Sequence, residues 1–112
     1  MKYITEKQMT VLVEMFADNC LIFDEANSSP ILRIDTEFID KLLQIISFCK
    51  QLIIDAKYEN IDFIDLNRLI LKILFKTEEI RDTYSQNSLG YHYFNSIYDR
   101  ILEGYVELAN TL

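Results

Sequence analysis

The single histidine and the two cysteines are the side chains best suited to nucleophilic or proton-transfer chemistry in this chain. His92 lies in an aromatic run with Tyr91 on one side and Tyr93 on the other. Cys20 and Cys49 fall at apolar positions of helical patterns, without the His, Arg or Lys neighbours that would lower a thiol pKa. Because acid–base and nucleophilic catalysis need convergent polar groups, the sequence predicts reduced core cysteines, no catalytic residue and no enzyme.

Carboxylates gather at two places, which raises the question of a metal site. Asp62 and Asp65 form one group, and Glu78, Glu79 and Asp82 form the other. Metal sites in helical bundles combine such acids with inward-facing Glu-x-x-His pairs, and this sequence contains no such pair. Since these acids flank a polar helical strip and only two glycines are present, the sequence predicts no metal, no cofactor and no phosphate-binding loop.

The charge and hydropathy of the chain exclude two further classes of partner. It has 11 Lys and Arg against 18 Asp and Glu, a formal net charge of −7, which disfavours binding to a nucleic-acid backbone. The longest strongly apolar run without a charge, residues 42–49, is far shorter than the roughly 20 residues that span a membrane. Residues 1–7 do not read as a signal peptide, so we expect a cytoplasmic protein with no membrane partner.

Apolar residues recur every three or four positions in four separate stretches, as in amphipathic helices. The first stretch begins near Thr5, which suits an N-cap, and the second begins at Asp35 or Thr36. Asn60 or Asp62 can cap the third. In chain order, the four apolar stripes are Met9, Leu12, Phe16, Cys20 and Phe23; Phe38, Leu42, Ile45, Cys49 and Leu52; Leu66, Ile70, Ile73, Ile80 and Tyr84; and Phe94, Ile97, Ile101, Leu108 and Leu112.

Breaks in the periodicity define the connections between these helices. Residues 24–35, which include Pro30, form a loop that is longer than most connections in bundles. Residues 86–90 form the last break, where Asn87 or Gly90 suits a helix C-terminus. The sequence therefore predicts one all-α domain over residues 1–112, an antiparallel four-helix bundle with one longer loop between its first two helices.

Tyrosines and acids accumulate together in the last quarter of the chain. The three acids follow one another at i,i+4 steps and therefore lie along one side of a helix. Tyrosine provides rigid amphipathic anchors at protein interfaces, and carboxylates steer a basic partner. The sequence thus predicts a partner-binding patch that consists of Tyr91, Tyr93, Tyr98, Asp99, Glu103 and Glu107.

These observations favour a small acidic protein-binding module from a bacterium, phage or mobile element. The leading hypothesis is an immunity or inhibitor protein that neutralises a partner protein, one with a basic surface, by stoichiometric binding. A second hypothesis is a structural or regulatory homodimer joined through surplus apolar residues of the second and third helices, such as Ile54, Leu69 and Leu74. A third is a small-ligand sensor with a pocket around Cys20 and Cys49.

Overall fold

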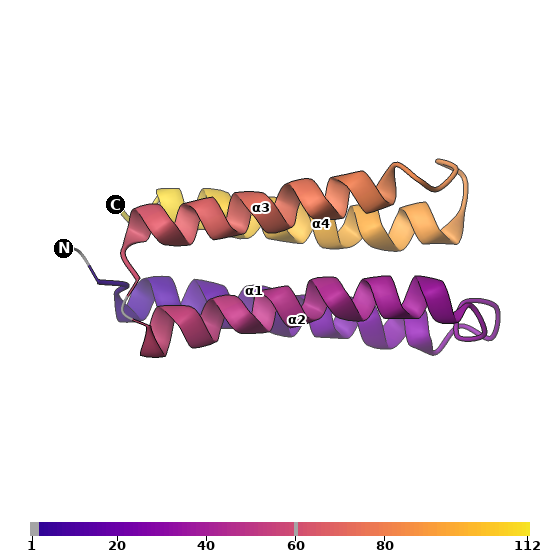
Figure 1. Ribbon diagram of the computed structural model, residues 1–112, viewed down its shortest axis with the longest axis horizontal. Coiled ribbons are helices and arrows are strands. Elements are labelled where there is room, and N and C mark those ends of the chain that lie inside the picture. Colours follow the sequence, from indigo (N-terminus) through magenta and orange to yellow (C-terminus); the bar gives the residue numbers. More distant parts are fainter. Residues whose placement is uncertain (1–2, 60) are drawn as a thin grey trace.

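A computed structural model describes residues 3–59 and 61–112 and contains four long helices in this part of the chain. They are α1 (Glu6–Asn27), α2 (Thr36–Tyr58), α3 (Phe63–Arg81) and α4 (Leu89–Ala109). Successive helices run in opposite directions, with the α1–α2 pair in one layer and the α3–α4 pair in the other (Figure 1). The all-α class and the four-helix bundle predicted from the periodicity are therefore confirmed.

Each helix begins at a polar side chain that satisfies a free backbone N–H of the first turn. Thr5 and Gln8 form a reciprocal capping box at α1, in which each side chain accepts a hydrogen bond from the other's backbone N–H. Asp35, Asp62 and Ser88 accept from the N–H three residues later at α2, α3 and α4. The predicted caps at Thr5 and Asp62 are confirmed, α2 begins at Thr36 as predicted, and Asn60 lies outside the described residues.

The core lies on the long axis of a rod of 46 × 21 × 18 Å. Each helix contacts its two neighbours in the ring α1–α2–α3–α4. At one end, Phe38, Tyr84 and Phe94 pack together with ring centroids 5.4 to 5.9 Å apart. The predicted stripe of α2 is confirmed, because all five of its residues have at most 2% of their surface exposed.

The buried face of α1 differs from the predicted one. Its centre consists of Leu12, Met15 and Asn19, whose side chains have no exposed surface. Of the predicted stripe, Leu12 alone is fully buried; the other members are half-buried, because they lie toward the outer side of the α1–α2 contact. Asn19 donates from Nδ2 to Cys49 Sγ at 3.7 Å, while its Oδ1 lacks a protein partner.

The connections also differ from the predictions at three places. α1 continues to Asn27, so the loop before α2 covers residues 28–35 rather than 24–35. α3 ends at Arg81, and Tyr84 therefore lies in the following turn although its ring still packs on the core. Neither Asn87 nor Gly90 ends a helix, because Ser88 caps α4 and Gly90 lies within its first turn.

Gly90 is required by a close approach rather than by a turn. A Cβ atom at this position would lie 2.6 Å from Cδ1 of the Tyr84 ring. The missing side chain therefore makes room for the aromatic cluster at this end of the bundle.

At the opposite end, Leu112 lies beyond the last residue of α4 and is 77% exposed, so it does not extend the apolar stripe of that helix. No helix in the described residues is long and apolar enough to cross a membrane.

Candidate protein-binding edge

The residues singled out for their chemistry do not converge on one site. His92 is exposed in the first turns of α4, and its ring packs against Tyr93 at a centroid distance of 5.2 Å. The carboxylates considered as metal ligands lie along α3 and its ends. Within residues 3–59 and 61–112, no group of three His, Cys, Asp or Glu side chains is arranged to hold a metal ion.

Both cysteines are free thiols, in different environments. Cys49 is fully buried in the core, and burial raises the pKa of its thiol to about 12 although the hydrogen bond from Asn19 opposes that rise. Cys20 is half-buried; partial burial and, to a smaller extent, the Asp24 carboxylate raise its pKa as well. Since the thiolate is the nucleophile and metal ligand, these environments keep both sulfurs in their unreactive protonated form at neutral pH.

Two of the predicted contact residues, Tyr91 and Tyr98, lie at the seam between α3 and α4. The guanidinium carbon of Arg81 lies 5.4 Å from the ring centre of Tyr91 and 4.8 Å from that of Tyr98. Arg81 also donates to Asn95 Oδ1 at 3.0 Å. Cation–π contacts of this kind occupy the ring faces, so these two tyrosines hold α3 against α4 and expose only part of their surface.

Two other predicted residues, Tyr93 and Glu107, lie on the opposite side of α4, against α1. Tyr93 is 8% exposed, and its hydroxyl donates to Glu25 Oε1 at 3.4 Å. Burial and the Glu25 carboxylate raise the pKa of Tyr93. Arg100 connects the two helices, because its Nε lies 2.6 Å from Asp18 of α1 and its Nη1 lies 3.5 Å from Glu107.

The remaining predicted residues, Asp99 and Glu103, are exposed on the outer surface of α4. Glu103 lies one turn before Glu107 and therefore continues the acidic row toward α1. The structure thus separates the six predicted residues: Tyr91 and Tyr98 lie at the α3–α4 seam, and Tyr93 and Glu107 lie at the α1–α4 seam. Asp99 and Glu103 lie on the surface between these two seams.

The contacts of Arg100 and Tyr93 reveal acids that sequence reasoning did not connect with this patch. Glu14, Asp18 and Glu25 follow one side of α1 at spacings of four and seven residues, which places them on one face of that helix. Asp18 and Glu25 contact α4 directly, so this row runs beside the row on α4. The helical spacing of the α1 acids was readable from the sequence, but the pairing of α1 with α4 was not.

We define the acidic edge as the surface formed by these two rows: Glu14, Asp18 and Glu25 of α1, and Asp99, Glu103 and Glu107 of α4. Arg100 lies between the rows, and Lys7 lies farther along α1. Arg100 is 12% exposed at its side chain, whereas Asp18 is 51% and Glu107 is 36% exposed. The carboxylates of Asp18 and Glu107 are therefore more accessible than the Arg100 side chain that pairs with them. The edge thus presents a negative potential to solvent.

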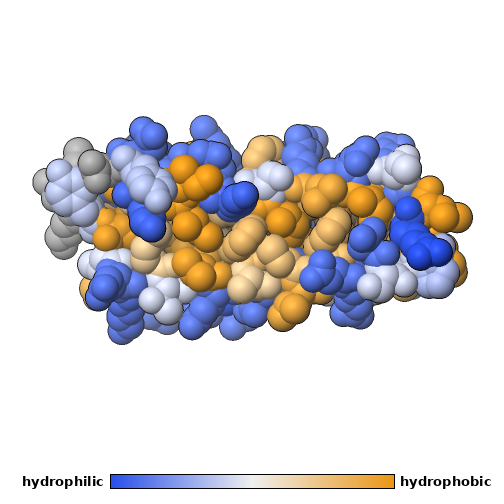
Figure 2. Space-filling model, turned by 90° about the horizontal axis from the view of Figure 1, so that it is seen from below, coloured by the Kyte–Doolittle hydropathy of each residue, from blue (hydrophilic) through white to orange (hydrophobic). Residues whose placement is uncertain are grey.

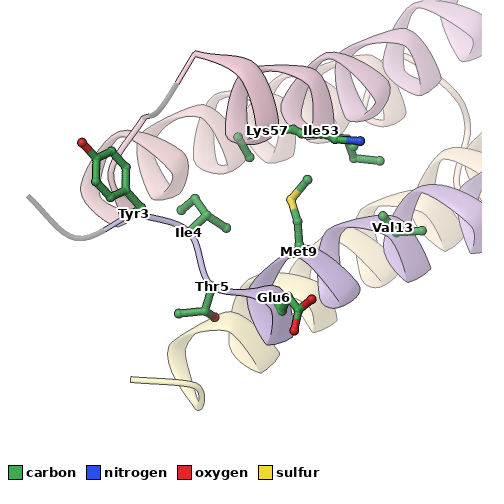
Figure 3. A pocket seen from close by; sticks show the side chains of 9 residues that line it. Tyr3, Ile4, Thr5, Glu6, Met9, Val13, Ile53 and Lys57 are labelled. Carbon is green, nitrogen blue, oxygen red and sulfur yellow. The ribbon is translucent and has the colours of Figure 1, made fainter.

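Several hollows on the described surface are open to solvent. One, of about 460 Å³, lies between the start of α1 and the end of α2 (Figure 3). Met9 points across it from α1 toward Ile53 and Lys57 of α2. Such an open hollow on the outside of a bundle lacks the enclosure that small-molecule sites require.

Comparison with protein-family models, with curated proteins and with solved structures gave no match for this chain.

Proposed function

We propose that this chain is a protein-binding module of the immunity or inhibitor kind, which neutralises a partner protein by binding a basic surface through the acidic edge. The observation that carries the proposal is the convergence of two carboxylate rows, one from α1 and one from α4, on a single side of the bundle. α1 and α4 contribute these six acids to the edge, whereas their Lys and Arg residues are Lys7 and Arg100. Much of the chain's net charge of −7 is thereby concentrated on one surface.

The arrangement favours a macromolecular partner over a small ligand. At a rise of about 1.5 Å per residue, the α1 row covers roughly 16 Å and the α4 row roughly 12 Å, so together they suit an extended basic surface. Charges on such a rim accelerate and orient association. Tyr93 anchors one end of the edge, because its ring is buried and its hydroxyl reaches Glu25. The alternative of a ligand sensor has less support, because Cys49 and its neighbours on the buried stripe of α2, Leu42 and Ile45, have no exposed surface.

A charge-reversal experiment separates a localised binding edge from a simple effect of net charge. The edge variant carries Glu14→Lys and Glu103→Lys, and the matched control carries Glu59→Lys and Glu79→Lys. All four residues are exposed, and both variants change the net charge by the same amount. The probe is a cationic helical peptide rich in lysine and arginine, titrated calorimetrically at low and high salt.

We expect the edge variant to weaken binding of the peptide by at least about tenfold and the control to retain most of the affinity. Binding to the wild-type protein should fall steeply as salt rises, because screening acts on exposed charges. An equal loss in both variants, or an affinity that does not depend on salt, would contradict a localised acidic binding edge.

The natural partner can then be sought with the same set of proteins. Wild-type, edge-variant and control proteins serve as parallel baits for the products of neighbouring genes in the genome of origin. The proposal predicts a basic protein that binds wild-type and control proteins with one-to-one stoichiometry and is not retained by the edge variant. It also predicts that the wild-type protein inhibits the activity of that partner. A captured partner that remains fully active would contradict the neutralising role.

A further inference from the structure

A continuous apolar band runs along the outer side of the α1–α2 pair, on a different flank of α1 from the acidic edge. Figure 2 shows this face, with hydrophobic atoms along its length and hydrophilic atoms on both borders. Val13 is 47% and Leu43 is 42% exposed. We call this band the outer groove and define it by Met9, Val13, Phe16, Cys20 and Phe23 of α1, with Ile39, Leu43, Ile46 and Ile53 of α2.

The spacing of the outer groove is that of a second helical packing seam. The residues of α1 and α2 that face the bundle core recur at alternating intervals of four and three: Gln8, Leu12, Met15, Asn19, Ile22 and Ala26, with Phe38, Leu42, Ile45, Cys49, Leu52 and Ala56. The same intervals recur one residue later on both helices: Met9, Val13, Phe16, Cys20, Phe23 and Asn27, with Ile39, Leu43, Ile46, Lys50, Ile53 and Lys57.

A repeat of this kind places side chains into the gaps of another helix. Each of the two helices therefore carries two seams side by side: the bundle buries the first, whereas most residues of the second are only partly buried. Scattered apolar residues on a surface need no explanation, but a row of apolar side chains along two adjacent helices, interrupted on α2 by Lys50, indicates an interface. The occupant must itself be helical to match this spacing.

The charges around the outer groove point to a second copy of this chain. Lys57 of α2 and Glu6 of α1 line the same hollow, Lys50 lies two turns before Lys57 on the same side of α2, and Asp24 lies beside Cys20. This face is thus close to neutral in a chain whose net charge is −7. Two copies of a strongly acidic protein repel each other least through such a face. A basic partner, by contrast, is favoured by the acidic edge.

We infer that the outer groove is the interface of a symmetric homodimer in which the α1–α2 pair of one copy packs on the α1–α2 pair of the other. Glu6 and Lys57 line the same hollow from opposite helices (Figure 3). A twofold axis parallel to the helices places α1 of one copy over α2 of the other at the same level. Glu6 of each copy then faces Lys57 of the second copy, which gives two complementary pairs.

Sedimentation equilibrium over the micromolar range tests this interface with two matched variants. The groove variant carries Val13→Glu and Leu43→Glu. The control carries Val106→Glu and Leu102→Glu on α4, where the side chains are similarly exposed at 50% and 38%. We expect the wild-type and control proteins to dimerise and the groove variant to be monomeric with an unchanged helical circular-dichroism spectrum. A monomeric wild-type protein, or a dimer that only the control variant dissociates, would overturn the inference.

A charge exchange tests the arrangement without placing acids in the apolar seam. Glu6→Lys and Lys57→Glu should each raise the dimer dissociation constant several-fold, because each creates two pairs of like charges. The double variant should restore most of the wild-type affinity. Absence of this rescue would contradict the twofold arrangement. These experiments do not depend on the proposed function, since the acidic edge lies on the other flank of α1 and its binding is measured with a separate probe.

Discussion

The two flanks of α1 have opposite chemistry although they belong to the same helix. The flank toward α4 carries Glu14, Asp18 and Glu25 and is held by Arg100. The flank toward the outer side of α2 carries apolar side chains such as Val13 and Phe16. A one-residue step along the sequence turns a helix by about 100°, so neighbouring residues serve different surfaces. The comparison shows how one helix can separate an electrostatic surface from an apolar one.

The buried face between these flanks should dominate stability. Leu12→Ala should lower the free energy of unfolding by about 2–5 kcal/mol, because Leu12 has no exposed surface and its loss leaves a cavity. Val13→Ala, one residue later and 47% exposed, should change it by no more than about 0.5 kcal/mol. Urea denaturation, at a protein concentration too low for self-association, measures the free energy of unfolding of both variants. Similar losses for the two variants would show that α1 does not have the buried face described above.

The stability of the bundle core should also depend on pH in the alkaline range. The folded state holds the Cys49 thiol protonated up to a pKa of about 12, whereas the unfolded chain releases that proton near the ordinary thiol pKa of 9.0. Stability from this group is therefore complete below pH 9 and is lost as the pH rises toward 12. The contribution is at most about 1.4 kcal/mol for each pH unit. Cys49→Val should flatten the pH dependence of urea unfolding in this window, and an unchanged slope would contradict a buried protonated thiol.

On the acidic flank, the contacts of Arg100 should stabilise the fold more than an ordinary surface ion pair does. Arg100→Gln removes its contacts with Asp18 and Glu107 and should cost about 1.5 kcal/mol, because its guanidinium is largely buried. The cost should shrink as salt screens the carboxylates that remain. Lys41→Gln breaks the exposed pair with Glu37 and is the control with the smaller effect. Thermal unfolding at two salt concentrations would refute this account if Arg100→Gln had no salt-dependent cost.

Replacing a polar residue of the bundle core should have the smallest effect on the free energy of unfolding. This effect should be stabilising, unlike those above. Asn19 is fully buried, and its Oδ1 has no protein partner. Asn19→Leu should therefore raise the free energy of unfolding by about 1 kcal/mol, because an apolar side chain removes the unpaired polar atom. Asn19→Asp, of nearly the same shape, should destabilise the fold strongly by burying a charge. Chemical denaturation that ranks both variants below the wild type would contradict the first expectation.

The two seams of α1 and α2 also explain which parts of the fold could be predicted from sequence. For α2, Phe38, Leu42 and Cys49 form the buried stripe that the periodicity predicts. For α1, the more apolar seam is the outer one, so the pattern favoured Met9, Phe16 and Cys20 over the true core face. The buried side of α1 contains Gln8 and Asn19, whose polar side chains conceal it from a reading based on hydrophobicity.

Tertiary contacts fix the orientation of α1, and these are not periodic in the sequence. Gln8 donates to Thr111 Oγ1 near the chain end, and Arg100 reaches Asp18 across the α1–α4 contact. Long-range contacts also determine where the residues of the predicted patch lie. The acidic row of α4 was readable from its i,i+4 spacing, whereas the contact of Tyr91 and Tyr98 with Arg81 depends on how α3 lies against α4.

Sedimentation equilibrium of the groove variant beside the edge variant tests the division of surfaces most directly. If self-association resides in the α1–α2 seam and partner capture in the α1–α4 carboxylates, Val13→Glu with Leu43→Glu gives monomers. Glu14→Lys with Glu103→Lys then remains dimeric. The reverse outcome, dimers of the former and monomers of the latter, would contradict it.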